Sequence, residues 1–211
     1  MTIDKFLVPT PFIDCDAESV KEMSLKLLRN EVGDRGKAVS LFYFVRDSIR
    51  YTIYGKRHLP QHFRASFVLS AGEGYCVQKA VLLVALARAA SIPARLRFAA
   101  IRNHMMPEEL LEKRGTNLFA YHGYADLYLE DTWVKATPTF DLLCCQEKGL
   151  RPVEFDGEHD ALLPSTTMDG KRYNEYVEDR GVFEDVPFDK IMEASLLKKY
   201  LTGSPLELDR V

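Results

Sequence analysis

Hydrophobic and polar residues follow two different periods along this chain, and these periods separate its expected helices from its expected strands. A repeat of three to four residues indicates a helix with one buried side, whereas alternation indicates a strand. The first period predicts helices over residues 17–31, 35–50, 76–90, 107–113, 140–147, 173–179 and 189–201. The second predicts strands over residues 94–102 and, between residues 121 and 141, two strands joined by a turn at Glu130-Asp131. In residues 51–73 and 149–170, glycines and prolines interrupt any period, so these segments are expected to be mostly irregular.

One cysteine, Cys76, stands at the expected first turn of the 76–90 helix, directly after Gly72 and Gly74. Unpaired N–H groups and partial positive charge at a helix N-terminus stabilise a thiolate, so this thiol is expected to ionise easily. The same N–H groups can hold a developing oxyanion. The position therefore predicts an activated nucleophile, against the common alternative of a cysteine that is only a small buried apolar residue.

A nucleophilic cysteine needs a base, and His122 begins the first of the two expected strands that follow. A rigid strand backbone would hold the imidazole in the fixed position that a catalytic base requires. The alternative is a histidine that is merely packed among the aromatic residues of the strand.

Three segments resemble the transglutaminase-like superfamily of papain-like cysteine enzymes, in the form of a bacterial-type single-domain member. They are Gly74-Tyr75-Cys76, the helix exit Ile92-Pro93-Ala94-Arg95, and the strand pair that ends in Trp133-Val134. The resemblance covers about residues 38–141. The whole chain, residues 1–211, is expected to form one domain, in which residues 142–211 add loops and helices to the matching core. It implies an α+β fold of the cysteine-proteinase type, in which helices pack on an antiparallel sheet and the nucleophile opens a helix. Cys76 then matches the nucleophile and His122 the base.

The third catalytic residue of that family is usually the Asp of a Trp-Val-x-x-Asp-Pro-Thr run, and here Thr137 occupies its place. A threonine hydroxyl can accept a hydrogen bond from imidazole and orient the ring, but it cannot stabilise imidazolium as a carboxylate would. Asp141, four residues further on, and Asp126, expected on the same face of the strand as His122, are the alternatives.

Three further residues are expected to line the cleft. Tyr75 and Trp133 would form walls that exclude water, and the amide of Gln78 would donate to an oxyanion. The competing interpretation assigns the two aromatic residues to the core and Gln78 to the helix surface.

Bulk properties narrow the function classes. A net charge of −3 and a pI near 6.0 give no support for nucleic-acid binding. No apolar run is long enough for a membrane span, and the first residues lack a signal-peptide pattern. Four cysteines without a disulfide or zinc spacing favour a reducing compartment, so a cytoplasmic location is expected. No metal and no cofactor is expected, because ligand clusters and nucleotide motifs are missing.

These observations lead to one functional hypothesis and two alternatives. The hypothesis is a cysteine-dependent enzyme that attacks an amide or peptide bond of a peptide, protein or small amide through a Cys76 thioester, and passes the acyl group to water or an amine. The first alternative is a catalytically inactive module that binds a peptide or protein. The second is a thioester-dependent N-acyltransferase.

Overall fold

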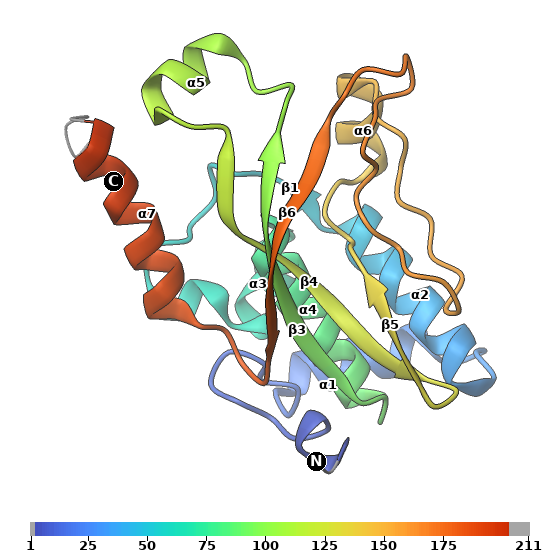
Figure 1. Cartoon of the computed structure of the whole chain (residues 1–211). Helices are drawn as coiled ribbons and strands as arrows, with labels where there is room; N and C mark the ends of the chain where they lie inside the picture. The colour runs from blue at the N-terminus through green and yellow to red at the C-terminus, as the bar shows by residue number, and fades with distance from the viewer. Residues whose placement is uncertain (1–2, 203–211) are drawn as a thin grey trace.

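The computed structural model describes residues 3–202 (Figure 1). Its helices are η1 (Ile3–Phe6), α1 (Glu18–Leu27), α2 (Gly33–Ser48), η2 (Pro60–Phe63), α3 (Ala65–Ala71), α4 (Cys76–Ala89), α5 (Glu108–Arg114), α6 (Leu142–Lys148) and α7 (Phe188–Thr202). Its strands are β1 (Arg50–Tyr51), β2 (Glu73–Gly74), β3 (Ala94–Asn103), β4 (Leu118–Leu129), β5 (Thr132–Ala136) and β6 (Asn174–Phe183). The predicted α+β class is confirmed, because helices pack on a main sheet whose strands all pair antiparallel.

The main sheet has the strand order β5-β4-β3-β6, and its long central pair is β3 with β4. Between β4 and β5 the chain turns through Glu130 and Asp131, whose φ angles are 47° and 65°. Positive φ at both central residues suits the tight turns that match the twist of a hairpin. The predicted strand at 94–102 and the predicted hairpin are therefore confirmed.

Helix α4 is the centre of the core. Its side chains are buried on every side from Val77 to Arg88, as expected for a helix that is apolar all round. One side contacts β3 and β4, and other sides contact α1, α2 and α3, so α4 lies between the sheet and a layer of helices (Figure 1). This packing fixes the position of the residue that opens the helix.

A buried lysine ties α4 to α2. Lys79 is fully buried, and its Nζ donates hydrogen bonds to the backbone oxygens of Arg46 (3.0 Å) and Ile49 (2.6 Å) at the end of α2. These carbonyls have no partner within their own helix, so the ammonium satisfies groups that burial would otherwise leave unpaired. Burial lowers the pKa of Lys79 to about 8.

The C-terminal part of the chain differs from the prediction. Residues 173–179 were expected to form a helix, and that prediction is wrong, because β6 pairs with β3 and completes the sheet. This strand lies at the edge of the sheet, and its residues are mostly half-buried or exposed, so its sequence lacks the apolar alternation of a strand with one buried face. Residues after 142 are therefore part of the sheet and not only appended loops and helices.

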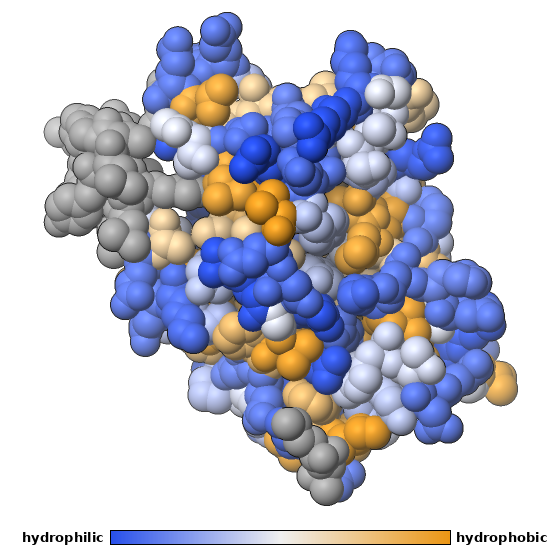
Figure 2. Space-filling view, in the orientation of Figure 1, coloured by the Kyte–Doolittle hydropathy of each residue, from blue (hydrophilic) through white to orange (hydrophobic). Residues whose placement is uncertain are grey.

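The surface is largely polar. Figure 2 shows hydrophilic side chains over most of the face that carries β6, with apolar patches scattered between them. Within residues 3–202, no helix has the length and apolar character that crossing a membrane requires.

Candidate active site

Cys76 is the first residue of α4, as the sequence predicted. Tyr75 precedes it with extended backbone, and the short parallel pair of β1 and β2 ends immediately before that residue. The thiol is therefore held at a fixed helix end, where the first backbone N–H groups have no partner within the helix.

Strand β4 meets this helix end at Gly123. Pairing between β4 and β5 ends at Ala125 with Ala136, and two residues beyond it the backbone N–H of Gly123 lies close enough to the sulfur of Cys76 to lower the pKa of the thiol. A Cβ at position 123 would lie 3.1 Å from the Cα of Val77, a tight contact, so the glycine allows this close approach without a shift of the helix. The contact brings the His122–Gly123 backbone directly to the nucleophile.

His122 is 1% exposed and lies among aromatic rings. Its Nε2 is 3.4 Å from the hydroxyl of Tyr176, and its ring stacks on Tyr124 with centroids 5.8 Å apart. Burial lowers the pKa of His122 to about 3, so the imidazole is neutral at physiological pH. Sequence reasoning missed Tyr176, because the segment that contains it was expected to be helical and not a strand beside β3.

None of the three candidates for the third catalytic residue bonds His122. Thr137 is fully buried after β5, and its hydroxyl makes no hydrogen bond of normal geometry, although it lies near enough to Tyr176 to lower the pKa of that phenol. Asp126 accepts from Arg95 (3.0 Å) and Arg97 (3.4 Å) on the outer face of the sheet.

Asp141 has a different role from the predicted one. One carboxylate oxygen accepts the backbone N–H of Cys144 (2.8 Å) and caps α6, and the other accepts the backbone N–H of Tyr51 (2.7 Å). The carboxylate therefore joins α6 to β1, and the structure does not place it on His122.

Two of the three expected cleft residues are placed differently from the prediction. Tyr75 does lie beside the nucleophile, where its ring contacts Phe63. The amide nitrogen of Gln78, however, donates to the backbone oxygens of Lys56 (3.0 Å) and His62 (2.8 Å), and its oxygen accepts from the backbone of Tyr75. With its amide hydrogens occupied, Gln78 holds the loop in place and is not free to stabilise an oxyanion.

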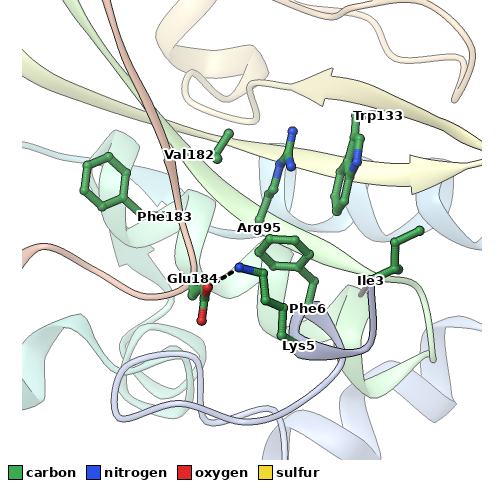
Figure 3. Close-up of a pocket in the computed structure, with 8 residues that line it drawn as sticks. All are labelled: Ile3, Lys5, Phe6, Arg95, Trp133, Val182, Phe183 and Glu184. Atoms are coloured by element: carbon green, nitrogen blue, oxygen red, sulfur yellow. Dashed lines mark hydrogen bonds and ion pairs between the residues drawn. The ribbon is translucent and has the colours of Figure 1, made fainter. Parts of the chain in front are cut away.

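Trp133 lies away from the candidate site. It pairs with Tyr128 across the hairpin, six residues from His122 along β4, which corresponds to about 20 Å of strand. Figure 3 shows Trp133 with Arg95 and Phe6 at a pocket near the N-terminus, and the guanidinium of Arg95 is 3.8 Å from the indole. The predicted role of Trp133 as a wall of the Cys76 cleft is therefore wrong.

The thiol of Cys76 also differs from the expectation. Burial raises its pKa to about 11, and the N–H groups of Gly123 and Val77 with the charge of Arg57 only partly counteract this effect. Burial thus disfavours both a lone thiolate and a lone imidazolium, and the resting site holds a neutral thiol and a neutral imidazole. Among the described residues, no group of three or more His, Cys, Asp or Glu side chains could hold a metal ion.

Comparison with known proteins identifies the family. A family model of the transglutaminase-like superfamily matches residues 21–138. A protein from Cytophaga hutchinsonii described as a "putative cysteine protease" superposes with a TM-score of 0.51 at 20% identity, covering 65% of this chain and 42% of that one. The periplasmic domain of TgpA from Pseudomonas aeruginosa superposes with a TM-score of 0.43 at 18% sequence identity. The match covers 57% of this chain and 42% of that domain. No curated protein matches the chain. The chain spans less than half of each of these solved structures, and the likeness to the Cytophaga hutchinsonii protein, at 20% identity, shows a shared fold only.

The raised pKa of Cys76 predicts how the thiol reacts with iodoacetamide in the free protein. Because the thiolate is the reactive form, the alkylation rate should keep rising past pH 9, towards the pKa of about 11. Mass spectrometry at each cysteine gives the rate, and the denatured protein provides the reference with a pKa near 8.5. A rate that levels off at or below pH 7 would instead show a stable thiolate–imidazolium pair.

Proposed function

The chain belongs to the transglutaminase-like superfamily, and from that premise we propose that it is a cysteine-dependent enzyme acting on amide or peptide bonds. The observation that carries the proposal is the close approach of the Gly123 backbone to the first turn of α4, because it brings the strand of the expected base to the expected nucleophile. The four cysteines are free, which suits the reducing cytoplasmic compartment that we propose for this chain.

In the proposed reaction, the sulfur of Cys76 attacks the carbonyl carbon while its proton passes to the imidazole of His122. Burial makes the separate ions unfavourable, so proton transfer accompanies the attack. The imidazolium then protonates the leaving amine as the carbon–nitrogen bond breaks, and a thioester on Cys76 remains. Water or an amine attacks this thioester, His122 takes the proton of the attacking group, and the thiol is restored.

The first turn of α4 provides the donors for the oxyanion in this proposal. The amides of Cys76 and Val77 lie near enough to the sulfur to lower the pKa of the thiol, and a helix N-terminus favours negative charge. In this proposal these backbone donors replace the Gln78 amide that the sequence suggested.

Tyr176 takes the orienting role that a carboxylate has elsewhere in the family. If its hydroxyl accepts the Nε2 hydrogen of His122, Nδ1 is left free to receive the proton of Cys76. The backbone N–H of Leu163 donates to the same hydroxyl (3.3 Å) and helps to fix its position. In this arrangement Thr137 acts on the imidazole only through Tyr176.

Within residues 3–202, no carboxylate contacts His122, and this favours a second candidate function, a non-catalytic module that binds a peptide or protein. A phenol orients imidazole but stabilises imidazolium less than a carboxylate would. Transfer from a thioester donor to an amine remains a further form of the same cysteine chemistry.

The proposal predicts an acyl-enzyme and a defined fate for it. Incubation with a peptide p-nitrophenyl ester should add one acyl group to Cys76, seen by intact mass and peptide mapping. Hydrolysis without amine, and amide formation with an added alkylamine, separate a hydrolase from a transferase. Cys76→Ser provides the matched control, and the absence of any adduct on wild-type Cys76 would favour the binding module.

The proposed role of Tyr176 predicts a loss of rate with retained binding. Tyr176→Phe removes the hydroxyl on Nε2, so kcat should fall by about 10- to 100-fold while KM changes little. Tyr124→Phe is the matched control, because its ring stacks on His122 but its hydroxyl faces Arg97. Equal small effects of both variants on kcat and its pH profile would remove Tyr176 from the mechanism.

A further inference from the structure

Two arginines approach the Cys76 end of α4 without a carboxylate partner. Arg57 is exposed in the loop between β1 and η2, with its guanidinium 5.6 Å from the ring of Tyr75, the residue next to the nucleophile. Arg114 ends α5, with its guanidinium 4.5 Å from the ring of Phe119, three residues before His122 on β4. Arg57 thus lies beside the residue that precedes the nucleophile, and Arg114 lies beside the strand that carries the base.

The positive charges of these arginines shift the pKa values of nearby groups, including Cys76. Arg57 lowers the pKa of Cys76 and of Tyr51, and with burial it also lowers the pKa of Arg114. Tyr51 in turn raises the pKa of Arg114, and an ionised Cys76 would raise the pKa of Tyr51. These electrostatic interactions indicate that the two positive charges of Arg57 and Arg114 act on the same region of the protein, on the side of the candidate site where Tyr51 and Tyr75 lie.

Most other arginines in the described residues form ion pairs with carboxylates. Arg46 pairs with Asp47 and Glu154, and Arg50 pairs with Glu73. In the part of the chain that the structure describes, neither Arg57 nor Arg114 forms an ion pair, and the Nε of Arg114 is buried without a hydrogen-bond partner. A buried guanidinium N–H without an acceptor is unfavourable, and an anion from outside would supply that acceptor.

We propose that Arg57 and Arg114 form a subsite that binds a carboxylate of the substrate, next to the bond that Cys76 attacks. The inference rests on the proposed function for the identity of that bond, and it names acidic peptides and amides as the substrate class. The planar fork of a guanidinium matches a carboxylate, and the anions that a peptide carries are Asp or Glu side chains and its C-terminus.

Peptide binding to the Cys76→Ala protein tests the subsite independently of turnover. Fluorescence anisotropy would compare labelled hexapeptides that differ only in Glu or Gln at one position, moved through the peptide, and pairs with a free or amidated C-terminus. When Glu stands at the position that meets the subsite, that peptide should bind about tenfold more tightly than the peptide with Gln there, as expected for a charge-assisted hydrogen bond. Arg57→Gln and Arg114→Gln should each reduce this preference, and the double variant should abolish it.

Arg35→Gln is the matched control, since Arg35 is exposed on α2, pairs with Glu158 (2.9 Å) and should leave the preference intact. Three results would overturn the subsite. They are equal affinity for both members of every peptide pair, no binding of either member, and a preference that survives in the double variant. Tighter binding of phosphoserine than of Glu would overturn its assignment to carboxylates. Selective binding without turnover by wild type would reject the proposed function alone, whereas turnover without selectivity would reject the subsite alone.

Discussion

The backbone of Gly123 lies against the first turn of α4, and the positions of the groups in the candidate site follow from this contact. It is possible because position 123 has no side chain and because β5 leaves β4 at Ala125, which frees the edge of β4 for Cys76. The nucleophile, the N–H groups around it and the backbone of His122 are thereby joined through main-chain atoms, which are more rigid than side chains.

Burial is the second constraint, and it explains the electrostatics of the site. It raises the pKa of Cys76, lowers that of His122, and lowers that of Lys79 one turn further along α4. Burial thus disfavours the charged forms of Cys76, His122 and Lys79. The imidazole of His122 lies beside the neutral hydroxyl of Tyr176, where the family usually has a carboxylate. In the proposed mechanism, charge therefore develops only during the reaction, where helix amides and the arginines can stabilise it.

The sequence predicted most of the elements that have a strong period or clear end signals. Helix α4 was identified from a long Ala/Leu-rich segment that ends before Pro93, and the β4–β5 hairpin from aromatic strands around Glu130-Asp131. The edge strand β6 was missed, because an exposed strand has no buried alternation to reveal it.

The site was harder to predict than the fold. Cys76 was assigned from its place at the start of a helix, and His122 from its match to the family pattern. His122 was expected to begin its strand but is the fifth residue of β4. The structure brings the backbone beside His122 to the first turn of α4. The partners of Gln78, Asp141 and Trp133 depend on contacts between distant segments that no local pattern encodes. Tyr176 reaches His122 from 54 positions away along the chain, so pairing of β6 with β3 had to be known first.

The most direct test of the central contact is the acylation rate of Cys76 in Gly123→Ala, measured by intact mass on protein shown to be folded by circular dichroism. The added methyl would lie 3.1 Å from the backbone of Val77, so we expect a loss of about 1–3 kcal/mol of stability and acylation slowed by about tenfold or more. Gly36→Ala provides the control, because its methyl would meet only the flexible end of Glu31. If folded Gly123→Ala acylates as fast as wild type, the approach of β4 to α4 does not assemble the site, and the account is wrong at its centre.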